Sequence, residues 1–365
     1  MLPNPIFVPL NTLSKQVYTF PMPRLIESAE DPTVLALPSL VLGPTRVGVG
    51  NIFHVIESAS SQSVVDISEI QISPRVKERL YELENGEKII VTSRKKLERP
   101  SKVDGVLRQD SNGYAWISHK RTDAVAADIR ARGPGALARD IAANWRGKFS
   151  FHAEERDGVG NIVAPGLRPP QIGALHAIGE HWSLYKNPAT VVMPTGTGKT
   201  ETMLATLVNY VRGPLLVVVP SRVLRDQTQG KFETLGLLRS LGNLASGVRN
   251  PIVGVITRRA RNEADLSILE NCNVVVTTMS AIAEGAAESL GPEIARRVHT
   301  LIVDEAHHIG AAGWSAFRGH FRNQSVLQFT ATPFRRDGKL VDGEVIYNYP
   351  LRLAQQDGYF CKITF

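Results

Sequence analysis

The stretch VVMPTGTGKTET, residues 191–202, joins a β-branched run to a glycine-rich loop. A phosphate-binding loop needs glycines where backbone N–H groups turn onto phosphate oxygens, then a lysine for the β and γ phosphates and a hydroxyl for Mg²⁺. Six consecutive residues are the candidates for holding a nucleotide in this way: Thr195, Gly196, Thr197, Gly198, Lys199 and Thr200. Met193 replaces the first glycine of the general pattern, so a glycine-rich turn that binds nothing remains the alternative.

A second stretch, LIVDEAHHIG at residues 301–310, ends an apolar run in two acids. Asp304 would offer one carboxylate to the Mg²⁺ shell, and Glu305 would orient the attacking water. Phosphoryl transfer needs little more than such positioning and charge neutralisation. The two stretches together predict a site for ATP and Mg²⁺, with Thr200 and Asp304 as candidate metal ligands. The alternative is an acidic pair that is only solvated.

From Asn161 onward, short apolar runs alternate with amphipathic helical segments, which is typical of a parallel sheet with crossover helices. We therefore expect residues 161–350 to form an α/β P-loop NTPase domain. The predicted strands are Thr190–Met193, Leu215–Val219, Ile252–Ile256, Val274–Thr277, Leu301–Val303 and Val326–Phe329. Such sheets bind ligands beyond the carboxyl ends of their strands, where both quoted motifs lie.

Residues 1–160 follow a different pattern and are expected to form an α+β accessory domain that binds nucleic acid or a partner. Eight prolines before residue 48 disfavour long helices there. The stretch PRVKERLYELENGEKIIVTS, residues 74–93, predicts a short helix, an Asn-Gly turn and a strand, and GYAWISH at residues 113–119 predicts another strand. Two helical segments are expected on either side of the Arg-Gly-Pro-Gly break at residues 132–135.

Positive charge is concentrated in the middle of the N-terminal half. The formal net charge is +7, and residues 71–148 contain 17 basic and 10 acidic side chains. A phosphate-binding surface could form from SRKKLERPSK, residues 93–102, with Trp116 and Trp145 stacking on bases. Four arginines could add to it: Arg130, Arg132, Arg139 and Arg146. The alternative is a solvated charged face.

Several kinds of protein are disfavoured by the composition. Cys272 and Cys361 match neither a disulfide framework nor a CxxC metal pattern, which fits a reducing compartment. The N-terminus lacks a signal-peptide pattern, and no segment has the roughly 18 apolar residues of a membrane span. A cytoplasmic protein without a membrane partner is therefore expected. His54, His119 and His152 are not spaced as zinc ligands, and we expect core or surface histidines.

The order of the motifs along residues 165–365 resembles that of the superfamily 2 helicases and translocases, in the DEAD/DEAH-box group. PTGTGKT and DEAH are similar to motifs I and II of that family, and FTATPFRRDG at residues 329–338 to motif III. RPPQ at residues 168–171 resembles the motif whose glutamine reads adenine. VVPSRVLRDQ and VVVTTMSAI, residues 218–227 and 274–282, are similar to motifs Ia and Ib, which contact the nucleic-acid backbone.

This resemblance implies a RecA-like fold and roles for matched residues. Arg168 and Gln171 would contribute to nucleotide binding, Lys199 and Thr200 would hold phosphate and Mg²⁺, and Asp304 would support the metal. Glu305 would act as the base. His307 would couple the nucleotide site to Thr330 and Thr332, and all four of Lys199, Asp304, Glu305 and His307 are catalytic candidates.

The resemblance also implies an ATP-dependent helicase or translocase that acts on nucleic acid. The sequences of the motifs resemble those of bacterial DNA-directed members and of type I and III restriction motors more than those of RNA-processing DEAH proteins. This resemblance suggests DNA as the partner and a role in defence. In this family a second RecA-like domain supplies arginines that reach the γ-phosphate. Residues 351–365 are expected to begin the connector to such a domain, in a longer chain or replaced by a partner protein. The alternative function is a nucleotide-responsive scaffold that hydrolyses little.

Overall fold

The computed structural model describes residues 33–111, 113–282, 290–308, 311–334, 338 and 340–359. The chain divides into two compact units, which are described separately. The first contains Met1–Leu40 and Glu57–Val125, and the second contains Val41–Ile56 and Ala126–Phe365. No helix of the described ranges is long and apolar enough to cross a bilayer.

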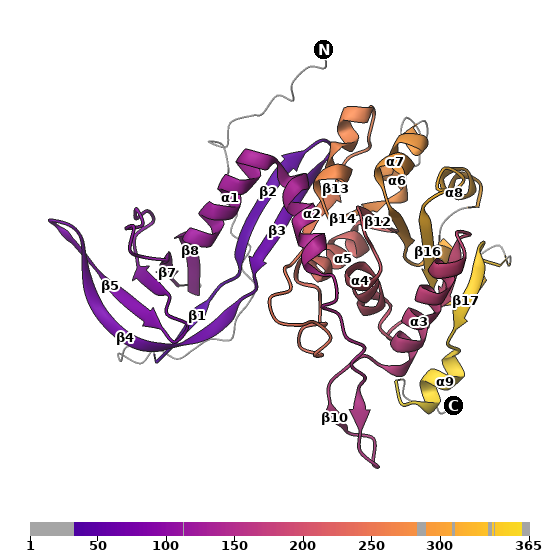
Figure 1. Cartoon of the computed structure of the whole chain (residues 1–365), viewed down its shortest axis with the longest axis horizontal. Coiled ribbons are helices and arrows are strands. Elements are labelled where there is room, and N and C mark those ends of the chain that lie inside the picture. The colour runs from indigo at the N-terminus through magenta and orange to yellow at the C-terminus, as the bar shows by residue number, and fades with distance from the viewer. Residues whose placement is uncertain are drawn as a thin grey trace. The chain divides into compact units, whose positions relative to one another are not determined.

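The first unit is built on a six-stranded, mainly antiparallel sheet. In spatial order its strands are β1 (Val34–Leu37), β4 (Ser60–Ser73), β5 (Val76–Leu83), β6 (Lys88–Thr92), β7 (Gly105–Asp110) and β8 (Gly113–His119). Figure 1 shows β4 and β5 as a long hairpin. A core of buried apolar side chains, including Leu35, Leu83 and Ile89, packs on this sheet. Helix α1 (Lys120–Arg132) follows β8.

The helix predicted from VKERLYEL is wrong, because these residues form strand β5. The segment pairs with β4 on one side and with β6 on the other, so its backbone hydrogen bonds are satisfied between strands. Its more buried positions alternate with exposed ones along most of the strand. The turn at Asn85-Gly86, the strand after it and the strand GYAWISH are confirmed.

The second unit is built on a nine-stranded sheet. In spatial order its strands are β17 (Glu344–Asn348), β11 (Ala189–Val192), β16 (Ser325–Thr330), β15 (Thr300–Val303), β12 (Leu215–Val219), β14 (Val274–Thr278), β13 (Ile252–Ile256), β3 (Gly50–Glu57) and β2 (Leu40–Val47). The pairs from β17 to β13 are parallel. The predicted α/β fold with a parallel sheet is confirmed, and all six predicted strands are present within one residue of their expected ends.

Helices connect and cover these strands (Figure 1). Those of the second unit, after α1, are α2 (Pro134–Asn144), α3 (Pro169–Leu184), α4 (Lys199–Asn209), α5 (Arg222–Thr234), η2 (Glu263–Asn271), α6 (Met279–Ile282), α7 (Gly291–Arg297), η4 (Ala306–His308), α8 (Ala311–Arg318) and α9 (Leu351–Gln356). A short hairpin of β9 (Glu155–Arg156) and β10 (Ile162–Ala164) precedes α3. Helices α1 and α2 flank the Arg-Gly-Pro-Gly break, as predicted.

A hairpin from the N-terminal region extends the large sheet. Strand β3 pairs antiparallel with β13, with Phe53 opposite Val253. The Asn250 side chain donates a hydrogen bond to the Val55 carbonyl, 3.0 Å away. Residues 41–56 and 126–160 thus lie in the unit of the parallel sheet, whereas the sequence assigned everything before 161 to the accessory domain. The difference arises because strand pairing joins segments that are far apart in the chain.

Candidate nucleotide-binding site

The predicted phosphate loop lies between β11 and α4, at the carboxyl edge of the sheet. Gly196 and Gly198 have φ angles of 89° and 96°, a conformation that residues with a side chain rarely adopt. Gly198 is the residue before α4, so the loop leads directly into the helix N-terminus, where backbone N–H groups are available to an anion. The local geometry is therefore that of an anion-binding loop.

The three threonines of the loop have different environments. Thr197 is fully buried, and its hydroxyl donates a hydrogen bond of 2.7 Å to the Pro194 carbonyl, which holds the turn. Thr195 is exposed on the loop, and Thr200 is half-buried in the first turn of α4. Thr200 can therefore reach a ligand at the helix N-terminus, whereas the Thr197 side chain has a structural partner.

Lys199 and Glu305 connect the loop to the acidic motif. Lys199 Nζ lies 2.9 Å from Glu305 Oε1, and the side chains are only 7% and 16% exposed. The same ammonium group is 3.4 Å from the Met193 carbonyl oxygen. The two motifs that the sequence separates by about a hundred residues thus meet because β11 and β15 are both adjacent to β16.

Asp304 begins the loop after β15 and is 8% exposed. Burial, followed by the nearby Glu305 carboxylate, raises the pKa of Asp304 to about 6, against the opposing effect of the Lys199 charge. Two acids this close at a buried edge are suited to a cation, since a divalent ion would offset the cost of holding both as carboxylates.

Glu305 has an unusual backbone conformation. Its φ angle is +50°, and its N–H donates a hydrogen bond of 2.9 Å to Asp304 Oδ1. Left-handed backbone at a non-glycine residue is costly and is concentrated at functional sites. Its Oε2 is buried and accepts no hydrogen bond among the described residues, although it lies 3.4 Å from His307 Nδ1. The Glu305 carboxylate therefore retains an acceptor for a further donor such as water.

His307 lies between the acidic motif and the end of β16. Its Nδ1 is 2.9 Å from Thr330 Oγ1, and Thr330 Oγ1 donates to the Thr332 carbonyl at 2.7 Å. The structure therefore brings His307, Thr330 and Thr332 into one chain of contacts. Arg335 and Arg336 of the same motif lie outside the described residues.

Arg168 and Gln171 lie at the start of α3, next to the phosphate loop. Gln171 is 3% exposed, and both ends of its amide have partners: Oε1 accepts from Arg168 N at 2.7 Å, and Nε2 donates to the Gly198 carbonyl at 3.2 Å. Arg168 Nη1 donates to the Gly196 carbonyl at 2.9 Å. Both side chains thus hold the loop, and the Gln171 amide is turned inward.

Tyr359 is a neighbour of this site that the sequence analysis missed. The Arg168 guanidinium carbon lies 4.9 Å from the centre of the Tyr359 ring, and that of Arg156 lies 5.4 Å from it. No local pattern marks this tyrosine, which follows α9 near the end of the described chain. It comes close to Arg168 because β17, which precedes α9, pairs with β11.

The described residues fit a nucleoside triphosphate with Mg²⁺. The loop offers backbone N–H groups and Lys199, Thr200 offers a hydroxyl, and Asp304 and Glu305 offer carboxylates, one with an unused buried acceptor. No group of three or more His, Cys, Asp and Glu side chains that could hold a metal ion occurs in the described ranges, so a Mg²⁺ ion here would also need ligands from the nucleotide and water.

The two tryptophans proposed to stack on bases both have hydrogen-bond partners within the fold. Trp145 is 2% exposed, and its ring N–H donates to the Arg249 carbonyl at 2.8 Å. Trp116 packs against the core of the first unit and donates to the Pro38 carbonyl at 2.7 Å. Because the Trp145 indole is buried, the prediction that it stacks on bases is wrong. Trp116 is half-buried, and the prediction that it contacts nucleic acid stays a prediction.

The basic stretch at residues 93–102 is partly neutralised. Arg94 pairs with Glu78 at 2.8 Å, and Arg99 pairs with Asp123 at 2.8 Å. Three exposed lysines of this stretch form no ion pair with described residues: Lys95, Lys96 and Lys102. These lysines are the part of the predicted surface that remains available to phosphate.

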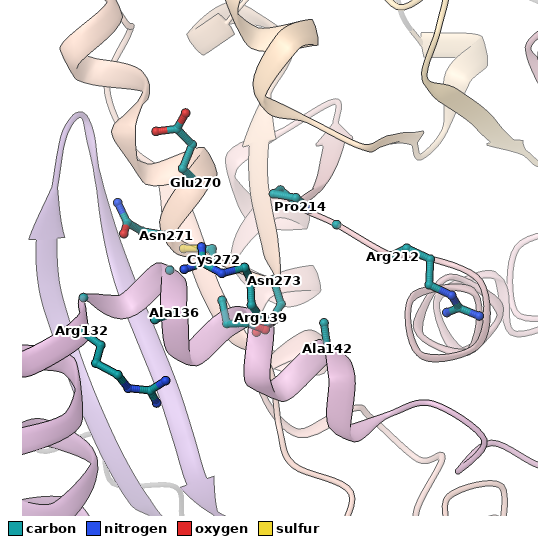
Figure 2. A pocket seen from close by; sticks show the side chains of 14 residues that line it. Arg132, Ala136, Arg139, Ala142, Arg212, Pro214, Glu270, Asn271, Cys272 and Asn273 are labelled. Atoms are coloured by element: carbon teal, nitrogen blue, oxygen red, sulfur yellow. Dashed lines mark hydrogen bonds between the residues drawn. The ribbon is translucent and has the colours of Figure 1, made fainter.

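A cavity of about 560 Å³ lies at the other edge of the large sheet (Figure 2). Its wall includes Pro214, Cys272 and Asn273, next to the amino ends of β12 and β14, together with α2. The phosphate loop and Asp304 lie at the carboxyl ends. This cavity is therefore separate from the nucleotide site.

Comparison with known proteins shows what parts of the chain are similar to. Residues 165–335 match the family described as type III restriction enzyme, res subunit. The chain is 30% identical over 162 residues to the DNA 3'-5' translocase XPB2 of Sulfurisphaera tokodaii. The matched region covers 43% of this chain and 31% of that protein. It is 24% identical over 216 residues to the type I restriction enzyme EcoKI endonuclease subunit of Escherichia coli, covering 53% and 17%.

Among solved structures, the chain is similar to a nuclease-deletion mutant of the type ISP restriction-modification enzyme LlaGI in complex with a DNA substrate mimic. The sequence identity is 21% and the TM-score 0.36, over 52% of this chain and 20% of that one. The matched regions span less than a third of the length of the two curated relatives, XPB2 and the EcoKI subunit.

Proposed function

We propose that this chain, which contains a RecA-like domain of the superfamily 2 helicase and translocase kind, binds ATP with Mg²⁺ and uses its hydrolysis to move on DNA. The observation that carries this proposal is the 2.9 Å contact between Lys199 and Glu305. It joins the phosphate loop to the acidic motif, as hydrolysis at this edge would require.

The residues would divide the chemistry as follows. Lys199 and the loop N–H groups would hold the β and γ phosphates, and Thr200 and Asp304 would hold Mg²⁺, which supplies neutralising charge to the phosphates. Glu305 would orient the attacking water and accept its proton. His307, in contact with Thr330, would transmit the state of the site toward the end of β16.

The relatives favour DNA as the nucleic acid along which the protein would move. XPB2 is named a DNA translocase, and EcoKI and the matched family are restriction enzymes. The net charge of +7 and the three unpaired lysines of the first unit suit a polyanion. A role in defence against foreign DNA follows from the restriction names and belongs to the same proposal.

We further propose that the site receives an arginine from a second RecA-like domain, in the same polypeptide or in a partner. Lys199 forms an ion pair with Glu305, and Arg168 is held by the Gly196 carbonyl. Charge developing on the transferred phosphoryl group would need a further cation on the side of the phosphates that faces away from the phosphate loop.

The test is whether nucleotide and DNA affinities are linked. A fluorescent DNA duplex is titrated with the wild-type chain without nucleotide, and with Glu305→Gln saturated with ATP and Mg²⁺. A motor domain should change its DNA affinity with ATP, and DNA should change ATP affinity by the same factor. Lys199→Ala should abolish the effect of ATP. Nucleotide binding without any linkage to DNA binding would contradict the motor.

A further inference from the structure

An ion pair joins helix α4, which follows the phosphate loop, to helix α5. Glu201, the residue after Thr200, lies in the first turn of α4, and its Oε1 is 3.2 Å from Lys231 Nζ on α5. The Glu201 side chain is 12% exposed, whereas that of Lys231 is 48% exposed. Lys231 is the one ion-pair partner that the described residues give Glu201. A largely buried carboxylate therefore stands at the helix end that would bind phosphate, and its counter-charge comes from another helix.

A carboxylate in this position opposes the binding of a triphosphate. The N–H groups of the first helical turn attract negative charge, whether it belongs to a glutamate or to a ligand. Glu201 and the phosphates would therefore compete for the same helix end. They would also repel each other across a partly buried region, where water screens charge weakly. An unpaired Glu201 would lower the affinity for ATP, and a counter-charge on it would remove most of that loss.

The fold holds the end of α5 against α4. Phe232, next to Lys231, is fully buried, and the Lys231 carbonyl accepts a hydrogen bond of 2.8 Å from Gly236 N. A Cβ added to Gly236 would lie 2.6 Å from Leu204 Cδ1 on α4, so the two helices meet closely there. The Lys231 ammonium group thus reaches Glu201 from a backbone position that packing fixes.

We propose that Lys231 is a positioning residue of the nucleotide site, which neutralises Glu201 and holds its carboxylate toward α5 so that the loop accepts a triphosphate. This inference rests on the proposed ATP site. The effect is one of charge, so it should be larger for ATP than for ADP, which has one phosphate fewer, and smaller at high salt. Lys231 would thereby favour the triphosphate over the diphosphate from outside the two nucleotide motifs.

The experiment is a double-mutant cycle of nucleotide affinity. Calorimetry with Mg²⁺ measures ATP and ADP binding to the whole chain in wild type, Lys231→Met, Glu201→Gln and the double variant. Lys231→Met should weaken ATP binding by about tenfold, and ADP binding by less, because Glu201 is left without its counter-charge. Glu201→Gln should bind ATP at least as tightly as wild type. The double variant should bind ATP within about threefold of wild type, because the repelling carboxylate is gone.

Salt and a control pair separate the effect of charge from that of shape. Relative to wild type at the same salt, the loss in Lys231→Met should shrink to about twofold or less at about 0.5 M salt, where charges are screened within a few ångströms. Lys77→Met is the matched control, because it removes the lysine of a 3.1 Å pair with Glu69 in the first unit. It should leave both nucleotide affinities unchanged.

Each contrary result has its own meaning. Wild-type affinity for ATP in Lys231→Met would refute the role of this lysine without touching the proposed ATP site. A double variant as weak as Lys231→Met would show that the lysine contacts phosphate or supports the fold, and would refute the inference too. An equal loss for ATP and ADP that salt does not alter would do the same. If wild-type protein binds neither nucleotide, the proposed ATP site itself is refuted.

Discussion

Lys199 and Glu305 form one ion pair, yet we expect substitution of the lysine to reduce ATP binding and substitution of the glutamate to reduce turnover. Lys199→Ala removes the side-chain cation for the β and γ phosphates, so ATP affinity should fall by at least about tenfold. Glu305→Gln keeps the size of the side chain but cannot accept a proton, so ATP should still bind while turnover falls by about 10² to 10⁴. Equilibrium binding and single-turnover hydrolysis distinguish the two. Normal hydrolysis by Lys199→Ala would contradict the assignment.

His54 predicts a pH dependence of stability in the second unit. It is 4% exposed on β3, with Nδ1 3.2 Å from the Pro251 carbonyl oxygen, and burial lowers its pKa from 6.5 to about 4. The folded chain thus favours neutral His54. As the pH falls from 6.5 through 4, the unfolded chain binds a proton on His54 before the folded chain does. The free energy of unfolding should therefore be highest above pH 6.5 and decrease over this range by about 3 kcal/mol in total.

Denaturant unfolding at pH 7 and pH 5 tests this expectation. The fall in the free energy of unfolding between the two pH values should be smaller in His54→Gln than in wild type, whatever the absolute stability of the variant. His152→Gln is the control, because His152 is exposed. An equal fall in wild type and His54→Gln would show that this histidine does not contribute.

At the scale of elements, the β2–β3 hairpin depends on a close approach at Gly50. A Cβ on Gly50 would lie 2.1 Å from the Val255 carbonyl oxygen and 2.6 Å from Ile268 Cδ1. Gly50→Ala should therefore force β3 away from β13 and destabilise the second unit by about 1–3 kcal/mol. Gly158→Ala is the control, since nothing lies within 4 Å of its added Cβ. Equal melting temperatures for the two variants would contradict the predicted role of the hairpin.

The basic stretch of the first unit can be tested by salt dependence. Replacing Lys95, Lys96 and Lys102 with glutamine should weaken binding to DNA of any sequence. It should also flatten the slope of log affinity against log salt by about 0.7 to 0.9 for each lost phosphate contact. The matched control replaces three lysines of the same unit that form ion pairs with Glu69, Glu82 and Asp104, namely Lys77, Lys88 and Lys120. If both triple variants keep the wild-type slope, the stretch is a solvated face.

At the scale of the whole molecule, the proposal that a second domain supplies an arginine predicts slow turnover by this chain alone. An arginine supplied across the cleft is typically worth about 10³ to 10⁵ in rate. The purified chain should therefore bind ATP but release phosphate very slowly, with or without a saturating DNA duplex. Rapid DNA-stimulated phosphate release by this chain alone would show that it contains the missing charge.

The strands of the large sheet could be predicted from the sequence, and so could the two motifs that we propose hold the nucleotide. Buried parallel strands are continuous apolar runs, and a phosphate loop is specified by adjacent residues, so both signals are local. The resemblance to helicases and translocases followed from the order of such local motifs. Residues 195–200, 304 and 305 could be proposed as the nucleotide site from their neighbours in the chain alone.

Tertiary structure decided the rest, because hydrogen bonds and burial depend on which distant segments meet. Val76–Leu83 became a strand through pairing with β4 and β6. Trp145 was buried, and its ring N–H found a partner in the carbonyl of Arg249, far along the chain. The pairing of β3 with β13 put an N-terminal hairpin into the large sheet. Packing turned Gln171 inward onto the loop and brought Tyr359 against Arg168. No local pattern encodes these contacts, since each becomes favourable only when the sheet has assembled.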